Sequence, residues 1–283
     1  MSDSCSEIRG GASPSAWAPL SQPVFRALWL ASLGSNIGTW MQNVGAAWLM
    51  TSLTPSPLYV ALVQTATYLP VLLIGLPAGA IADIFDRRKV LLVTQAWMTV
   101  AAGLLAFATW FGFTGPNLLL FLTFVLGAGA TVNAPAWQAI MPELVPRPQL
   151  ASAIALNSMG FNISRAIGPA LGGLLISFVN PAAAFTVNAI SFVGVVAVVY
   201  GWKREAIGPR DKSERVVNAV MAGVRYVRYA PELHGVFLRT FLFVIPASAL
   251  WSLLPLLAKE DLASGSTGYG IMLGALGAGS VAM

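Results

Sequence analysis

One arginine inside a long apolar segment is the side chain of this sequence best placed to do chemistry. Arg165 lies near the middle of the apolar segment 150–178. If that segment crosses a bilayer, a charge at its centre costs about 2.5–3.5 kcal/mol, so it is expected to face a water-filled cavity or a partner. Either Arg165 contacts a substrate or a gate, or it is a structural arginine that neighbouring helices satisfy.

A polar stripe in the segment 25–50 is a second candidate. Its residues are spaced to share one helical face, and they are Ser32, Asn36, Thr39 and Asn43. Toward lipid such a stripe is unfavourable, so it faces either other helices, through hydrogen bonds between them, or a central cavity. Trp40 is placed to stack on a ring-bearing substrate, with a core or interfacial tryptophan as the alternative. Further polar candidates for lining a cavity are Asn133, Gln138, Asn157 and Asn162.

The sequence lacks the residues that enzymes and metal sites need. His234 is the only histidine and Cys5 the only cysteine, which excludes an internal disulfide and a Cys/His metal cluster. No P-loop lysine pattern supports an ATP-driven pump. We therefore expect neither an enzyme nor a bound cofactor or metal, and energy from an ion gradient or from the substrate's own gradient.

Seven apolar stretches are long enough to cross a bilayer as helices, since a core about 30 Å thick needs roughly 20 residues. They are 25–50, 58–82, 90–113, 118–140, 150–178, 182–202 and 236–258, and an eighth begins at Tyr269. Charged residues make up 10% and hydrophobic residues 57% of the chain, against about 25% charged residues in soluble domains. This composition predicts an all-α protein with many membrane spans.

The basic residues, which give a net charge of +5, gather on one side of these segments. When segment ends are counted alternately, every Lys and Arg except Lys259 and Arg165 falls on the side of the N-terminus and of the 203–235 stretch. The positive-inside rule places that side in the cytoplasm. We interpret the charge as a topology signal and not as a nucleic-acid-binding surface. A seven-helix receptor, the competing interpretation, has its N-terminus outside, against this pattern.

Four regions are expected along the chain: a cytoplasmic tail (1–22), a six-helix transmembrane half (23–202), a cytoplasmic linker (203–235) and an incomplete second half (236–283). Within the linker, valines near one face of 213–229 predict an amphipathic helix at the membrane surface. Six spans, a linker and a further span are typical of a transporter built from two six-helix halves. Because the sequence stops inside an apolar segment, we expect a truncated chain, with a re-entrant or short terminal helix as the alternative.

The loop after the second apolar segment resembles the signature loop of the major facilitator superfamily. The matching residues are Gly79, Asp83, Arg87 and Arg88, whereas Ile84 and Asp86 replace the usual arginine and glycine. The resemblance implies a latch that holds the cytoplasmic side in one conformation; a plain turn carrying positive charge is the alternative. We expect Gly79 to allow close helix contact, and Asp83 to pair with Arg87 or to cap the next helix.

The fifth segment resembles the GPxxGG antiporter motif of the same superfamily through Gly168, Pro169, Gly172 and Gly173. This implies a hinge or a leak seal, with ordinary packing of small residues as the alternative. In the fourth segment Thr123 stands where drug–proton antiporters carry an arginine, so that arginine's role in proton coupling does not transfer. The stretches 128–146, 156–157 and 165–169 resemble the transmembrane secretion effector branch, which includes the enterobactin exporter.

These resemblances cover about residues 20–283 and imply a major facilitator bundle: the N-terminal six-helix half and the first one or two helices of the second half. The function they imply is secondary active export of a small molecule, such as a siderophore, drug or lipophilic metabolite, by alternating access. Family resemblance adds proton coupling, a bacterial inner membrane location and a monomer. The alternatives are a truncated fragment that transports nothing, a half-transporter acting as an assembly partner, and an inward permease.

Overall fold

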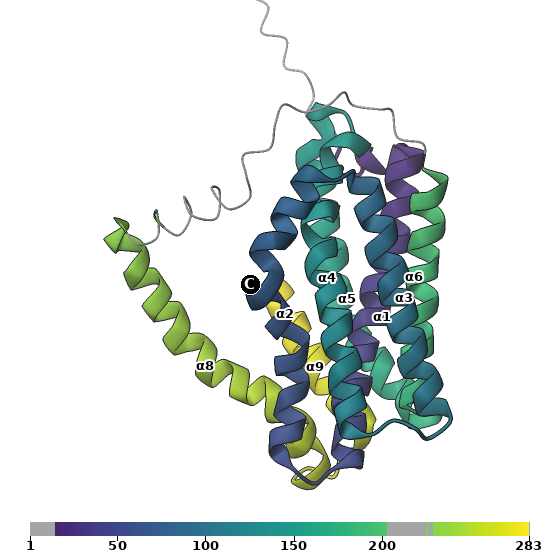
Figure 1. The fold of residues 1–283 in the computed structure, drawn as a ribbon, viewed down its shortest axis with the longest axis vertical. Coiled ribbons are helices and arrows are strands. Elements are labelled where there is room, and N and C mark those ends of the chain that lie inside the picture. The colour runs from purple at the N-terminus through teal and green to yellow at the C-terminus, as the bar shows by residue number, and fades with distance from the viewer. Residues whose placement is uncertain (1–14, 203–224, 226–228, 283) are drawn as a thin grey trace, which may run out of the picture.

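The computed structural model describes residues 15–202, 225 and 229–282, and this part of the chain is a bundle of long helices without strands (Figure 1). The α-helices are α1 (Pro23–Leu53), α2 (Pro57–Ile84), α3 (Arg87–Trp110), α4 (Pro116–Leu144), α5 (Leu150–Phe178), α6 (Pro181–Gly201), α8 (Pro231–Glu260) and α9 (Gly265–Ala282). Two short 3₁₀ helices, Ala18–Ser21 and Arg147–Gln149, precede α1 and α5. The all-α bundle expected from the sequence is confirmed.

Local sequence explains where these helices begin. Proline opens α1, α2, α4, α6 and α8, where its missing N–H costs nothing because the first N–H groups of a helix have no partner within it. Two side chains act as N-caps: Asp86 Oδ1 accepts from the Lys89 N–H of α3, and Asn180 Oδ1 accepts from the Ala183 N–H of α6, each at 3.0 Å.

The apolar stretches of the sequence lie within these helices to within a few residues. Six helical segments of the described chain are long and apolar enough to cross a membrane, in α2, α3, α4, α5, α6 and α8. Unlike the sequence expectation, α1 is not among them, because its polar residues lower its hydropathy. The amphipathic helix expected at 213–229 lies, apart from Arg225 and Tyr229, outside the described residues.

The helix α1 packs between α5 and α6, α3 lies against α6 and α4, and α2 lies against α4 (Figure 1). Two buried apolar clusters fill the two ends of this six-helix unit. One surrounds Phe25, Leu91 and Ile140, and the other surrounds Met50, Leu105 and Phe185. Since α1 is covered by its neighbours, its polar residues meet other helices more than lipid, which agrees with its lower hydropathy.

The last two helices attach to this unit unequally. The helix α9 lies along α5, whereas α8 reaches the bundle only over its C-terminal part and leans away over its N-terminal part (Figure 1). A third buried cluster joins Met41 and Ile176 to Leu254 and Tyr269. At the same end, Lys259 of α8 donates a hydrogen bond to the Thr51 carbonyl of α1. That carbonyl is one of the last of α1 and has no partner within the helix.

The helices α1 and α5 approach each other backbone to backbone. A Cβ atom on Gly172 would lie 2.8 Å from Met41 Cα, and one on Gly168 would lie 2.6 Å from Trp40 Cβ. Real Cβ atoms do not come this close to a neighbouring helix, so only glycine fits at these positions. Close approach through small residues is a common way for helices to pack within a bilayer.

We expect Gly172→Ala to destabilise the protein by about 1–3 kcal/mol, because the new methyl group forces α1 and α5 apart. Gly103→Ala is the matched control, since a Cβ on Gly103 of α3 meets nothing within 4 Å. Alanine favours helices over glycine, so the control is expected to be unchanged or slightly more stable. Thermal unfolding followed by circular dichroism in detergent measures both. Equal melting temperatures for the two variants would contradict the close approach.

Candidate functional site

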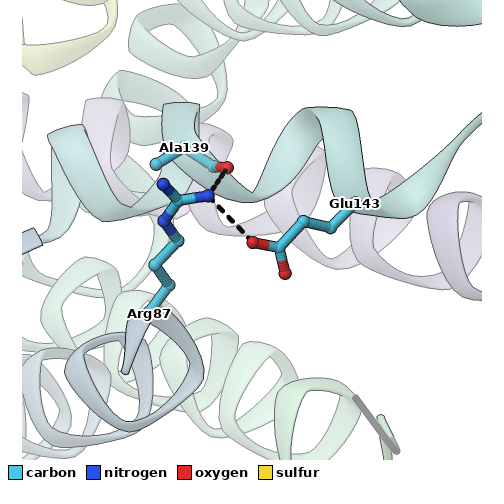
Figure 2. A network of polar contacts seen from close by, with 3 residues as sticks. All are labelled: Arg87, Ala139 and Glu143. Carbon is cyan, nitrogen blue, oxygen red and sulfur yellow. Dashed lines mark hydrogen bonds and ion pairs between the residues drawn. The ribbon is translucent and has the colours of Figure 1, made fainter. Parts of the chain in front are cut away.

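The start of α3 is joined to the end of α4 by an ion pair. Arg87 Nη1 donates to Glu143 Oε1 at 2.8 Å and to the Ala139 carbonyl oxygen at 2.7 Å (Figure 2). The two charged side chains are 16% and 9% exposed, so water screens their attraction only weakly. Arg87, one of the four residues of the predicted latch, therefore holds α3 and α4 together within the six-helix unit.

Arg88, the next residue, joins α3 to α6. Its Nε donates to the Val199 carbonyl at 3.0 Å and its Nη2 to the Tyr200 carbonyl at 2.6 Å. Because α6 ends at Gly201, these carbonyls belong to its last turn and have no partner within the helix. A positive charge there also interacts favourably with the helix dipole.

Two local expectations for the predicted latch are wrong in this conformation. Asp83 is exposed and, within the described part of the chain, pairs neither with Arg87 nor with the N-terminus of α3. Glu143 takes the arginine and Asp86 takes the cap instead. Gly79 makes no close helix contact, since a Cβ there meets nothing within 4 Å. Both residues lie on the C-terminal part of α2, at a surface that the described helices leave open.

The motif Gly168, Pro169, Gly172 and Gly173 places α5 between two backbones. Gly168 and Gly172 face α1, as described above. On the other side, Gly173 meets the Ser266 carbonyl of α9, and a Cβ on Gly270 would lie 2.5 Å from the Pro169 carbonyl oxygen. Ser266 also donates to the Gly173 carbonyl at 3.2 Å. The motif thus lies where the first six helices meet α9.

Proline and glycine also act together next to Arg165. Pro169 has no N–H, so the Arg165 carbonyl four residues earlier loses its helical partner. A Cβ on Gly277 of α9 would lie 2.5 Å from that carbonyl oxygen, which means that the α9 backbone covers it. On the α1 side, buried Ser164 donates to the Gly160 carbonyl at 2.8 Å and to the Leu33 carbonyl at 3.4 Å. The backbone that carries Arg165 is therefore held from both sides.

The side chain of Arg165 meets aromatic rings. Its guanidinium carbon lies 5.6 Å from the centroid of the Trp251 ring of α8, within the range of a cation–π interaction. The Tyr68 hydroxyl of α2 is close enough to interact electrostatically with the guanidinium. Phe161 lies one turn earlier on the same face of α5, and its ring centroid is 6.5 Å from that of Trp40 on α1. We call Arg165, Trp251, Tyr68, Phe161 and Trp40 the arginine site.

The predicted polar stripe of α1 does not act as one surface. Asn36 Nδ2 donates to Ser32 Oγ at 3.4 Å within the helix, whereas Thr39 Oγ1 donates to Asn188 Oδ1 of α6 at 3.4 Å. Asn43 is partly buried, and the described residues provide it with no hydrogen-bond partner. Of this helix, Trp40 is the predicted residue that the structure brings to the arginine site.

The other predicted lining residues are also dispersed. Asn133 Oδ1 accepts from Thr94 Oγ1 at 3.0 Å and from Gln95 Nε2 at 3.3 Å, so it joins α4 to α3. Gln138 is exposed. Asn157 accepts from the Trp137 indole at 3.3 Å, joining α5 to α4. Asn162 Nδ2 donates to the Ser158 carbonyl at 3.0 Å and remains partly exposed, three residues before Arg165.

Sequence reasoning missed the buried polar contact between Gln42 and Asn188 and the Trp251 ring beside Arg165. Asn188 Nδ2 donates to Gln42 Oε1 at 2.5 Å, and a Cβ on Gly38 would lie 2.8 Å from Ser191 Oγ, so α1 and α6 share a polar contact inside the unit. A list of all polar residues inside apolar segments would have found Gln42 and Asn188. Nothing in the sequence marks Trp251 as the neighbour of Arg165, because the two are far apart in the chain.

Comparison with known proteins identifies the family. The sequence profile described as transmembrane secretion effector matches residues 14–283. The chain belongs to this family of the major facilitator superfamily. Its relatives are transporters and not enzymes.

Among curated relatives, the staphyloferrin A transporter of Staphylococcus aureus is 25% identical over 240 residues, 84% of this chain and 60% of that protein. The multidrug efflux pump Tap of Mycobacterium tuberculosis is 26% identical over 214 residues, 72% of this chain and 51% of the pump. The chain thus spans between half and three fifths of the length of these relatives.

A solved structure shows the same fold. It is a bacterial homologue of the human lysosomal transporter Spinster, in an inward-facing and unoccupied conformation. The TM-score is 0.73 at 16% identity, over 92% of this chain and 60% of that one. The major facilitator fold expected for a transmembrane secretion effector is confirmed.

We expect Arg87→Met to destabilise the protein by about 2–3 kcal/mol, because it removes the charge-assisted contacts that Arg87 makes with the Glu143 carboxylate and the Ala139 carbonyl. Lys89→Met, which removes an exposed charge from the same turn, is the matched control and is expected to change stability by less than about 0.5 kcal/mol. Chemical unfolding in detergent measures both. The double variant Arg87→Met/Glu143→Leu is expected to recover part of the loss. An equal effect of Arg87→Met and Lys89→Met would contradict a structural ion pair.

Proposed function

We propose that this protein is a secondary active exporter of a small organic molecule that works by alternating access. The observation that carries the proposal is the position of Arg165. It lies in the middle of α5, and its guanidinium reaches α8 of the second half. Transporters of this architecture bind substrate near the midplane where their halves meet. A charge at that depth is costly and is kept where it serves a function.

The relatives support export as the direction. One relative is a multidrug efflux pump and another is a staphyloferrin A transporter. A siderophore, a drug or a lipophilic metabolite remains the proposed class of substrate. The GPxxGG segment resembles the motif of antiporters, which supports the proton gradient as the driving force. Uptake by the same protein is the alternative that the transport assay below distinguishes.

Two sets of residues are proposed to govern the change of conformation. Gly168, Pro169, Gly172 and Gly173 act as hinge and seal, because they place α5 against α1 and α9 without side chains between the backbones. Gly79, Asp83, Arg87 and Arg88 act as the latch. In the present conformation Arg87 and Arg88 hold the first half together, whereas Asp83 and Gly79 are left to contact the second half in the other conformation.

The proposed location is the bacterial inner membrane, as a monomer with its N-terminus in the cytoplasm. Basic residues at one end of the bundle support this orientation: Arg87, Arg88, Lys89 and Arg147 flank the ends of α2, α4 and α6. At the opposite end lies Lys259. The positive-inside rule favours the more basic end for the cytoplasm.

Expression of the gene in its native reading frame in an efflux-deficient bacterial strain tests transport. We expect lower accumulation of a siderophore or of members of a panel of lipophilic drugs, and we expect a protonophore to abolish the difference. Arg165→Ala is expected to reduce export about tenfold, the effect of losing one charged contact to the substrate. Exposed Arg147→Ala is the control for loss of a positive charge and is expected to keep full export.

Asp83→Asn is expected to weaken export while leaving the melting temperature unchanged, because Asp83 is exposed in the present conformation. If no compound accumulates less than in cells with empty vector, although the protein is in the membrane, export of these substrates is refuted. Higher accumulation in expressing cells shows an inward permease instead. No transport in either direction supports the half-transporter or fragment alternative.

Reporter fusions test the orientation. Alkaline phosphatase is active only outside the cytoplasm, so we expect a fusion after Phe113 to be active and a fusion after Trp202 to be inactive. Green fluorescent protein, which folds in the cytoplasm, is expected to give the opposite pattern at the same two positions. If both reporters reverse, the N-terminus lies outside and the orientation proposed from the charges is wrong.

A further inference from the structure

The Arg165 guanidinium is a cation held in the membrane without a matching anion. Within the residues whose side chains the structure describes, the acidic residues of the helices lie at or next to their ends: Asp83 in α2, Glu143 in α4 and Glu260 in α8. No acidic side chain of the described chain pairs with Arg165, and its Nε has no hydrogen-bond partner there. A buried donor without an acceptor is unfavourable.

Trp251 covers the guanidinium. The ring lies 5.6 Å from the guanidinium carbon, and the Nε atom is shielded from solvent. A π face attracts a cation but accepts hydrogen bonds only weakly. The indole therefore attracts the charge of Arg165 without satisfying its Nε–H group. Trp251 belongs to α8, which lies against the bundle only over its C-terminal part (Figure 1), so a movement of α8 away from α5 would take the ring off the guanidinium.

The surroundings of the cation are aromatic. Phe161 and Tyr68, which belong to the arginine site, are 47% and 56% exposed, so the site includes exposed ring surface. Trp40 adds a further ring next to Phe161. Flat apolar groups stack favourably on such rings. The site therefore combines one fixed positive charge with several ring faces from α1, α2, α5 and α8.

We propose that the arginine site binds an organic anion, a carboxylate carried on a flat aromatic body, and that this anion displaces Trp251 from the guanidinium. The inference rests on the proposed transport function and names the substrate class of the same site. A carboxylate offers two oxygens to the planar N–H fork of arginine, so it satisfies Nε and a neighbouring Nη together. An amine is repelled by the same charge, and a neutral amide gains less.

Ligand binding to the purified full chain tests this inference. The chain is placed in nanodiscs of phosphatidylcholine, which carry no net lipid charge, and the probes are 2-naphthoate, 2-naphthamide and 2-naphthylmethylamine. These share one ring system and differ in charge. We expect equilibrium dialysis to show naphthoate binding at least about tenfold more tightly than the other two, as a charge-assisted pair in place of a neutral contact gives. Equal affinity for naphthoate and naphthamide overturns the inference.

Two variants separate binding from folding. Arg165→Gln is expected to reduce naphthoate affinity to that of naphthamide. Trp251→Leu is expected to tighten naphthoate binding about fivefold to tenfold, because the anion no longer competes with the ring, and to leave naphthamide unchanged. Trp48→Leu is the control and changes neither affinity, because Trp48 stacks on Tyr269 in the buried cluster that joins α8 and α9 to the bundle. Weaker naphthoate binding by Trp251→Leu overturns the displacement even where Arg165→Gln does not fold.

The source of the anion and the transport function are tested separately. Phosphatidylglycerol added to the nanodiscs competes with naphthoate if a lipid headgroup is the occupant, and that result overturns the assignment to a soluble organic anion; no competition supports it. If cells export neutral drugs through Arg165 while naphthoate is not preferred, the proposed function stands and the anion site falls. If naphthoate binds as expected and nothing is transported, the anion site stands and the proposed function falls.

Discussion

The close approach of α5 to a neighbouring backbone on each of two sides is the contact on which the rest of the structure depends. Gly168 and Gly172 allow the close approach of α1, and Gly173 allows that of α9. Without a hydrophobic effect between helices in lipid, association depends on such packing. It places α5 between α1 of the six-helix unit and α9, so any movement of α9 against that unit acts on α5. Arg165, the one charged residue of α5, is therefore carried by a helix that contacts both α1 and α9.

Prolines inside the helices are the reason why this close packing is needed. Inside a bilayer each carbonyl needs a partner or close cover, and a proline frees the carbonyl four residues before it. In α5, Pro169 leaves the Arg165 carbonyl without its helical partner, and Gly277 of α9 covers that carbonyl oxygen. In α2, Pro70 frees Ala66, and a Cβ on Gly127 of α4 would lie 3.3 Å from that oxygen and 2.6 Å from the Thr67 oxygen. In both places a glycine of the facing helix lies where a side chain would hold the helices apart.

The sequence predicted what depends on one helix alone and missed what depends on its neighbours. Apolar length alone identified the helices, because crossing a bilayer requires about 20 such residues whatever surrounds them. The partners of polar groups were not predictable in this way. Asn133 was predicted to line a cavity, and in the structure it accepts a hydrogen bond from Thr94. Arg87 pairs with Glu143 and not with Asp83. Both outcomes depend on which helices are neighbours, and the spacing of residues along one helix does not reveal its neighbours.

The basic residues show why Arg165 differs from the rest. Arg88 and Lys259 each donate to carbonyls in the last turn of another helix, α6 and α1. Such carbonyls are free because a helix has no N–H beyond its end. Midway along a span nearly every carbonyl is already bonded, and the one that Pro169 frees is covered by α9. Among the residues that the structure describes, Arg165 therefore has no backbone acceptor for its Nε at its own depth. A ring face such as that of Trp251 attracts its charge but leaves its buried Nε–H without an acceptor, so an acceptor that enters with a ligand has the most to gain there.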